Sequence, residues 1–171
     1  MRKKILIVDD VIFSLLYAKN LVGNRTNAEI ITASDGHQAL ESIKKERPDL
    51  VLMDLFMPVM NGDECCRIVK SDPTINKTPI IMLSSARKEE DLKRCVEAGC
   101  DDFFSKPILK IEVFFEKLKK FIDIVIREYP RIPIDAEVDY FFAGKEYKGH
   151  ARDVSEGGIL LEDSSVPPQG S

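Results

Sequence analysis

Five short apolar runs recur at nearly even spacing over the first 105 residues of the chain. They are KILIV (4–8), EIIT (29–32), LVLM (50–53), IIML (80–83) and DFFS (102–105). Between them, apolar residues such as Ala39, Leu40 and Ile43 lie three and four positions apart, as on one face of a helix. Strands that alternate with helices predict a parallel sheet covered on both faces, since continuous apolar runs leave no polar face for solvent. We therefore expect an α/β doubly wound domain.

Polar residues follow the expected strands at their carboxyl ends, where a doubly wound sheet binds its ligand. These residues are Asp9 and Asp10 after the first strand, Asp54 after the third, Ser84 after the fourth and Lys106 after the fifth. Adjacent carboxylates at the end of a buried strand repel each other and lose hydration unless a cation lies between them. Mg²⁺ is the expected cation, because it accepts carboxylate and phosphate oxygens and keeps several waters.

The same residues predict a phosphoryl-transfer site. Lys106 and Mg²⁺ would neutralise the phosphoryl oxygens while one carboxylate attacks phosphorus. Asp54 is the expected nucleophile because it stands alone on the central strand, and Asp9 and Asp10 would hold the metal. Taken singly, each residue has a simpler explanation: Asp10 or Ser84 could cap a helix, and Lys106 could be solvated.

At these positions the chain resembles the receiver domain of two-component response regulators, over residues 3 to about 124. The residues that carry the resemblance are Asp9-Asp10, Asp54 in MDLFMP, Ser84 in MLSSA, and Phe103 and Lys106 in AGCDDFFSKP. The resemblance implies a flavodoxin-like sheet of order 2-1-3-4-5. It also implies that Asp54 receives a phosphoryl group from a histidine kinase, a phosphotransfer protein or a small phosphodonor.

The resemblance further assigns a switch and a fourth metal ligand. Ser84 would move to bond the phosphoryl group, and Phe103, at the aromatic switch position, would rotate inward. The main-chain carbonyl of Phe56 would complete the protein ligands of Mg²⁺. Phe103 stands where the family more often has tyrosine, and Phe56 places a large apolar side chain beside the site.

A long amphipathic helix is expected over residues 108–129. Its apolar residues step by four and three alternately, as in a heptad seam, at Ile111, Phe115, Leu118, Ile122, Val125 and Tyr129. Its first half would pack on the sheet and its second half would connect to the next piece, or the helix would also form a homodimer. Gly and Ser are absent from residues 107–134, so we expect a stiff link.

After Pro130, IDAEVDYFF, KEYKGHARDV and GILLE alternate apolar and polar residues, which predicts antiparallel strands. Arginine forks bind phosphate and guanine edges, and Asp and Ser on a turn can bond a base. Such residues are present as Arg127 and Arg131 in REYPRIP and as Asp153, Ser155 and Gly158 in DVSEGG. Together they resemble the RxxxR and DxSxxG motifs of PilZ domains, which bind cyclic di-GMP. Only the N-terminal part of a PilZ barrel can be found, so dinucleotide binding is expected of a full-length parent.

The predicted domains are a receiver over residues 1–124 and, over residues 125–171, a helical linker with an N-terminal PilZ-like fragment. The tail at 164–171 has no periodicity and is expected to be loose. The net charge of −4 comes entirely from residues 127–171, and neither half is a basic nucleic-acid surface, so no DNA binding is expected. No apolar run approaches the ~20 residues of a membrane helix, and the start is no signal peptide, which favours the cytoplasm. The four cysteines form no CxxC pair and are interpreted as buried hydrophobes.

The sequence thus favours a response regulator with a PilZ-type output, which catalyses only its own phosphorylation and dephosphorylation. One alternative is a stand-alone receiver that acts through protein contacts and binds no nucleotide. A phosphatase of the haloacid dehalogenase type is disfavoured because that class wants a carboxylate two residues after the nucleophile, where this chain has Phe56. A flavin carrier is disfavoured because the acidic pair in DDVIFS would repel its phosphate. Homodimerisation through the receiver or the helix at 108–129 is left open.

Overall fold

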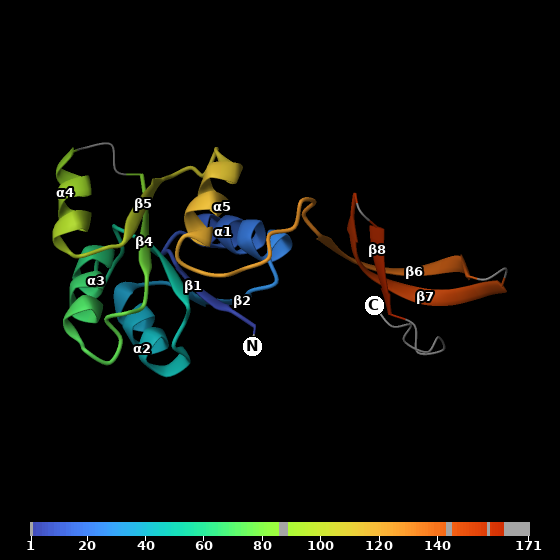
Figure 1. The fold of residues 1–171 in the computed structure, drawn as a ribbon, viewed down its shortest axis with the longest axis horizontal. Coiled ribbons are helices and arrows are strands. Elements are labelled where there is room, and N and C mark those ends of the chain that lie inside the picture. Colours follow the sequence, from blue (N-terminus) through green and yellow to red (C-terminus); the bar gives the residue numbers. More distant parts are fainter. Residues whose placement is uncertain (1, 86–88, 143–144, 157, 163–171) are drawn as a thin grey trace. The chain divides into compact units, whose positions relative to one another are not determined.

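All five apolar runs form strands in the computed structural model, which describes residues 2–85, 89–142, 145–156 and 158–162. The strands are β1 (Lys4–Val8), β2 (Glu29–Ala33), β3 (Leu50–Asp54), β4 (Ile80–Ser84) and β5 (Asp102–Ser105). They pair in parallel in the order β2-β1-β3-β4-β5 (Figure 1), so the predicted order is confirmed. The winding reverses between β1 and β3, whose carboxyl ends lead to Asp9 and Asp54. The expected tail at 164–171 lies outside the described residues.

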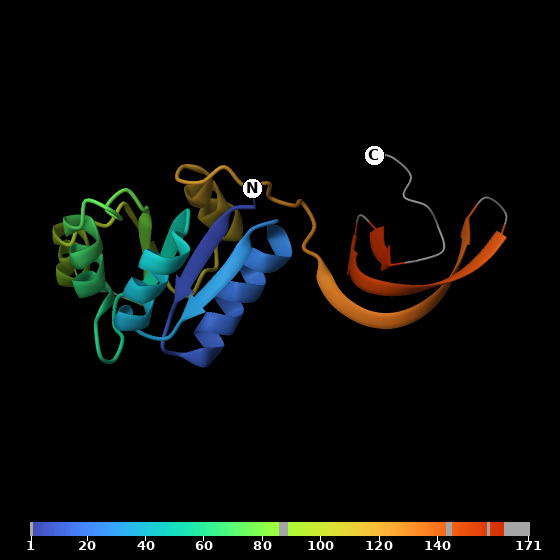
Figure 2. The ribbon, with the colours of Figure 1, turned by 90° about the horizontal axis from the view of Figure 1, so that it is seen from below.

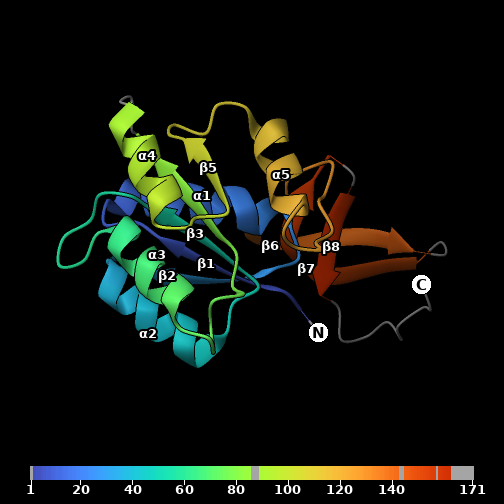
Figure 3. The same ribbon diagram turned by 60° about the vertical axis from the view of Figure 1, so that its left-hand side comes forward.

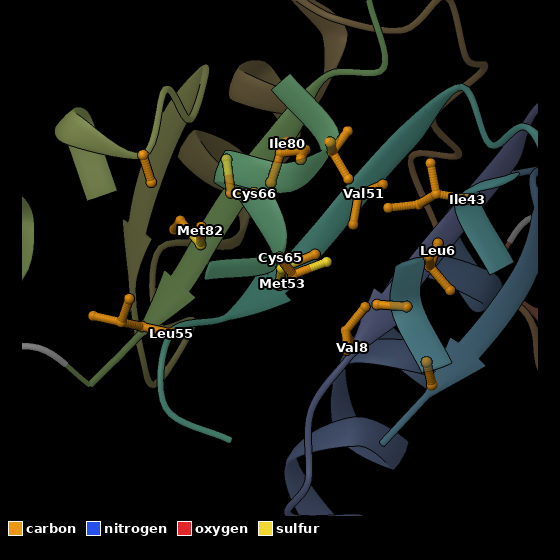
Figure 4. Close-up of a cluster of buried hydrophobic side chains, with 14 of the residues drawn as sticks. Leu6, Val8, Ile43, Val51, Met53, Leu55, Cys65, Cys66, Ile80 and Met82 are labelled. Atoms are coloured by element: carbon orange, nitrogen blue, oxygen red, sulfur yellow. The ribbon is translucent and has the colours of Figure 1, made fainter. Parts of the chain in front are cut away.

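Helices cover both faces of this sheet, as the views in Figures 1 and 3 show. They are α1 (Ile12–Arg25), α2 (Gly36–Glu46), α3 (Gly62–Ser71), α4 (Glu89–Glu97) and α5 (Ile111–Lys119). Alternate residues of each strand enter two apolar clusters: Leu6 and Val8 pack with α2 and α3, and Ile5 and Ile7 pack with α1 and α5. Figure 4 shows the first cluster, which includes Cys65. Burial of both faces accounts for the continuous apolar strands. No described helix is long and apolar enough to cross a membrane.

The prediction of a long helix over residues 108–129 is wrong, because α5 ends at Lys119. Of the residues assigned to the second half of the heptad seam, Val125 is 67% exposed and Tyr129 is 38% exposed. A homodimer built on a helix over 108–129 therefore has no helix to form it. A homodimer through the receiver stays a prediction.

The helix ends early because the spacing of the buried residues changes after α5 from a helical period to a period of two. Ile122, Ile124 and Ile126 all pack against the cluster shared by α1 and α5, while Val125 between them is exposed. Ile126 forms an antiparallel bridge with Thr26, at the end of α1. Alternation with a period of two is that of extended chain, and the β-branched residues of IDIVI favour it. The linker therefore begins as an extended segment that belongs to the core of residues 1–126.

Residues 127–171 form a second unit. Its described strands, β6 (Ile132–Phe142), β7 (Lys145–Ser155) and β8 (Gly158–Glu162), pair antiparallel in the order β6-β7-β8, so the predicted β piece is confirmed. Figure 2 shows β6 and β7 as strongly curved strands, and the register shifts at Pro133/Ala136 and at Ala151/Asp153 explain the bend. Among the side chains described in this unit only Ala151 is buried, so these strands enclose little core of their own.

The extended path of residues 122–126 predicts that substitutions at two neighbouring positions lower the free energy of unfolding by very different amounts. We expect Ile124→Ala to lower the free energy of unfolding by about 2–5 kcal/mol, because a buried side chain leaves a cavity. We expect Val125→Ala to change it by less than about 0.5 kcal/mol, because that side chain is exposed. Urea unfolding of both variants measures the difference. A larger loss at Val125 than at Ile124 would restore the helical seam and contradict the extended path.

Candidate functional site

Three carboxylates meet at the carboxyl end of the sheet. Side-chain oxygens of Asp9, Asp10 and Asp54 all lie within 4.8 Å of one another. Asp9 is 3% exposed and Asp54 is 8% exposed, whereas Asp10 faces solvent. The fold thus brings together the three acidic residues that the sequence singled out, from the ends of β1 and β3.

Lys106 supplies a positive charge between two of these carboxylates. Its Nζ lies 2.5 Å from Asp9 Oδ2 and 3.1 Å from Asp54 Oδ1. The main-chain N–H of Lys106 donates to the carbonyl of Ser84 at 2.9 Å, which extends the pairing of β4 and β5 beyond the end of β5. An ammonium in this place offsets the repulsion between the two buried carboxylates Asp9 and Asp54.

Asp9 and Asp54 differ in how well their charges are satisfied. Asp9 accepts further hydrogen bonds from the Val11 N–H at 3.0 Å and from the Ser14 hydroxyl at 2.5 Å. Asp54 accepts one from the Leu55 N–H at 2.9 Å. Burial raises the pKa of Asp54 above its ordinary value; the nearby Lys106 ammonium opposes this shift without cancelling it. Asp54 is therefore a buried carboxylate whose charge is incompletely compensated.

The loop from β3 to α3 folds back on Asp54. The Gly62 N–H donates to the Leu55 carbonyl at 2.9 Å. A β-carbon at Gly62 would lie 2.0 Å from the Asp54 carbonyl oxygen, so only glycine permits this approach. Val59, at the loop's exposed tip, has a φ of 66°, a left-handed conformation that is strained for a β-branched residue. The loop is thus held in one path by its close contact with the candidate nucleophile.

Phe56 is held by a helix that the sequence did not connect with it. The guanidinium of Arg94, on α4, lies 5.3 Å from the centre of the Phe56 ring. Arg94 also donates to the Asp63 carboxylate, on α3, from Nη2 at 3.0 Å and from Nε at 3.2 Å. The sequence could not identify Arg94 or Asp63 as neighbours of the site, because charged residues are common at such helix positions. The role of the Phe56 carbonyl as a metal ligand stays a prediction.

The two predicted switch residues lie on neighbouring strands. Ser84 ends β4 and is fully buried, and it pairs with Ser105 of β5. Phe103, on β5, pairs with Met82 and is half-buried against the cluster formed with α2 and α3. Both residues therefore lie within the strands that lead to the acidic site, and their movement stays a prediction.

The donor set fits Mg²⁺. Three carboxylates supply hard oxygen ligands within a small volume, and the exposure of Asp10 leaves room for the waters that this ion keeps. Among the described residues, the Lys106 ammonium is the one cation that contacts these carboxylates, and it faces two buried acids. A further cation would therefore be favoured electrostatically.

The second unit brings together part of its predicted nucleotide site. Arg131, just before β6, pairs with Asp153 of β7, with Nη1 2.6 Å from Oδ1. The Ser155 hydroxyl donates to the Gly158 carbonyl at 3.4 Å across the turn to β8. Arg127 is half-buried and lies outside the described strands. Four of the five predicted residues thus gather at one end of the sheet.

Family models match two stretches of the chain. The model described as "Response regulator receiver domain" matches residues 5–119, which is more than half of the chain. The chain belongs to the response regulator receiver family. A PilZ domain model matches residues 126–171. The receiver domain is thus followed by a PilZ stretch, as the sequence motifs predicted.

Relatives match the receiver domain. The alkaline phosphatase synthesis transcriptional regulatory protein PhoP of Bacillus subtilis is 38% identical over 116 residues, which is 66% of this chain and 46% of PhoP. The response regulator PleD of Caulobacter vibrioides is 35% identical over 116 residues, which is 67% of this chain and 25% of PleD. The chain therefore spans less than half the length of these relatives.

Solved structures match the same region. The chemotaxis protein CheY4 of Vibrio cholerae has a TM-score of 0.65 and 29% identity, covering 71% of this chain and 100% of CheY4. The receiver domain of a sensor histidine kinase of Pseudomonas aeruginosa has a TM-score of 0.65 and 26% identity, and the match covers 71% of this chain and 98% of that domain's chain. The latter was solved with a magnesium ion coordinated in its active-site cleft.

The raised pKa of Asp54 predicts a pH-dependent loss of stability without metal. Folded protein holds the Asp54 proton more tightly than unfolded protein, so the free energy of unfolding should fall as pH rises through this raised pKa. Asp54→Asn removes the titration, so it should be more stable than wild type near pH 7 and equal to it near about pH 3. Urea unfolding across this pH range measures the gap, with Asp123→Asn as the control at an exposed position. A gap that widens toward acid pH would contradict the assignment.

Proposed function

We propose that the receiver domain accepts a phosphoryl group on Asp54 and thereby controls a PilZ-type output. The observation that carries the proposal is the Lys106 ammonium bonded to both Asp9 and Asp54 at the carboxyl edge of the sheet. An aspartate poised beside a lysine and two further carboxylates suits a covalent phosphoryl acceptor. The donor would be a histidine kinase, a phosphotransfer protein or a small phosphodonor in the cytoplasm.

Each residue has a distinct role in the proposal. A carboxylate oxygen of Asp54 attacks phosphorus, and the electron pair of the breaking bond leaves with the donor. Lys106 then shifts from the Asp54 carboxylate to an oxygen of the phosphoryl group. Mg²⁺, held by Asp9, Asp10, Asp54 and the Phe56 carbonyl, would supply positive charge to the phosphoryl oxygens. An aspartyl phosphate would carry more negative charge than the Asp54 carboxylate, so the proposal needs both Lys106 and Mg²⁺ to stabilise it.

The response to phosphorylation would pass through β4 and β5. The hydroxyl of Ser84 is buried at the end of β4 and would bond the phosphoryl group by moving toward Asp54. That movement would open space for Phe103, which is half-buried on the adjacent strand, to rotate inward. The proposed protein is therefore a switch, and its only catalysis is its own phosphorylation and dephosphorylation.

A phosphatase is the weaker candidate. Its second carboxylate would have to stand at Phe56, whose ring is held by Arg94 of α4. Arg94 is in turn bound to the Asp63 carboxylate, so the Phe56 ring contacts a cation whose charge is paired. Phenylalanine itself can neither donate nor accept a proton at that position.

Intact mass after incubation with Mg²⁺ and a small acyl phosphate tests the proposal. Wild type should gain one phosphoryl group, and Asp54→Asn should gain none, because an amide is not a nucleophile. Asp123→Asn, an exposed position in the same domain, is the matched control and should label like wild type. Equal labelling of Asp54→Asn, or full labelling of wild type without Mg²⁺, would refute the assignment.

For the second unit we propose a cyclic di-GMP output. The Arg131 guanidinium would bind a phosphate or a guanine edge, and Asp153 and Ser155 would bond the base from the neighbouring strand. The ion pair between Arg131 and Asp153 keeps both side chains at one end of the sheet. Ligand binding would exchange this ion pair for contacts with the dinucleotide, with Arg127 and Gly158 completing the site.

Calorimetry with cyclic di-GMP tests this output on protein that carries a complete PilZ barrel. Arg131→Ala should weaken binding at least tenfold, since a charged hydrogen bond is worth about 1.5–3 kcal/mol. Arg152→Ala is the matched control, because Arg152 lies on the same sheet and pairs with Asp135. Absence of binding by that wild-type protein, with normal phosphorylation of Asp54, would favour the alternative of a receiver that acts through protein contacts alone.

A further inference from the structure

The C-terminal end of α4 is closed by a Schellman motif. The Cys100 N–H donates to the Cys95 carbonyl at 3.2 Å, and the Gly99 N–H donates to the Val96 carbonyl at 2.9 Å. Gly99 has a φ of 83°, the left-handed conformation that this motif requires. The backbone therefore turns sharply between α4 and β5, with Cys95 in the last turn of the helix and Cys100 just beyond it.

This motif brings the side chains of its first and last residues into contact. In most helices the contact is between two apolar side chains. Here the two positions are Cys95 and Cys100, and both side chains pack in the same apolar cluster. The main chain thus places the two cysteines next to each other.

The two thiols differ in access and acidity. Cys95 is 1% exposed, whereas Cys100 is half-buried, and the other two cysteines are fully buried on α3. The hydrogen bond from Cys95 lowers the pKa of the Cys100 thiol, although burial opposes it. Burial raises the pKa of Cys65 and of Cys66 to about 12. Cys100 is therefore the cysteine that solvent can reach and that ionises first.

We propose that Cys95 and Cys100 are an oxidation site, at which a hydroperoxide converts the two thiols into an intramolecular disulfide. The inference is independent of the phosphoryl chemistry at Asp54. It adds a role to two of the four cysteines that the sequence analysis interprets as buried hydrophobes, of which Cys100 is only half-buried.

The reaction proceeds in two balanced steps. The Cys100 thiolate attacks hydrogen peroxide, so that a sulfur–oxygen bond forms, the oxygen–oxygen bond breaks and hydroxide leaves. The Cys95 thiol then attacks the sulfenic sulfur, a sulfur–sulfur bond forms, and the sulfenic oxygen departs as water. The proton of Cys95 leaves with that water, and the proton that Cys100 released on ionising neutralises the hydroxide of the first step. In total the thiols lose two hydrogen atoms and the peroxide is reduced to two waters.

The bridge would tie the last turn of α4 to the residue that precedes β5. β5 carries Phe103 and leads directly to Lys106. Oxidation would therefore restrain the helix end and the strand that the proposed switch uses. A thiol reductant would restore the free movement of both.

Tryptic peptides separate the four cysteines into two matched pairs. Trypsin cuts after Arg94 and, because Pro107 blocks cleavage after Lys106, next after Lys110, so one peptide is 95–110. Cleavage after Lys45 and Arg67 yields the other, 46–67, which contains Cys65 and Cys66. Each chain thus carries its own control pair.

The full chain is treated with increasing hydrogen peroxide, quenched, unfolded, alkylated and digested. We expect peptide 95–110 to be unalkylated and lighter by two hydrogen atoms, and peptide 46–67 to carry two alkyl groups. Cys95→Ala and Cys100→Ala should abolish the loss of hydrogen, and Cys66→Ala should not. A peptide 95–110 that is alkylated twice, that gains only oxygen, or that is linked to peptide 46–67 or to a second chain would overturn the proposal.

Discussion

The contact of the Lys106 ammonium with Asp9 and Asp54 is the interaction on which the site depends. Burying two carboxylates at one edge of a sheet is costly, and a single cation between them reduces that cost. The three residues come from the ends of β1, β3 and β5, which are distant in sequence. The order β2-β1-β3-β4-β5 brings them together, because it sets β1 and β3 side by side at the reversal of winding.

The same contact ties chemistry at Asp54 to the edge of the sheet. Any group that joins Asp54 competes for the Lys106 ammonium, and Lys106 is bonded through its main chain to Ser84. A new charge at Asp54 therefore acts on β4 and β5 at once. The loop after Asp54 returns to it at Gly62, where a β-carbon would lie 2.0 Å from the Asp54 carbonyl oxygen, so the main chain on either side of the nucleophile is closely packed.

The sheet, its order and the acidic residues could be predicted because their signals are local. A buried parallel strand is continuously apolar, and its carboxyl end leads to the site. The positions of Asp54 and Lys106 at the ends of such strands therefore identify them as candidate site residues. The end of α5 could not be predicted as easily, since Leu118 and Ile122 fit a heptad seam and Ile122, Ile124 and Ile126 equally fit an extended chain. Contact with Thr26, about a hundred residues away, decides between them. The contact of the Arg94 guanidinium with the Phe56 ring is likewise a tertiary contact, and no spacing in the sequence predicts it.

The extended path changes how the two units are joined. A stiff helix through residues 108–129 would have carried motion past the domain boundary as a rigid rod, and that route is absent once α5 ends at Lys119. The last core contact of the receiver is made by Ile126, which is bridged to the end of α1 and packed with α5. Arg127, the first arginine of the RxxxR motif, follows it directly in the chain. If the two proposed activities are coupled, the chain between them is this extended segment, which Ile122, Ile124 and Ile126 anchor in the receiver core.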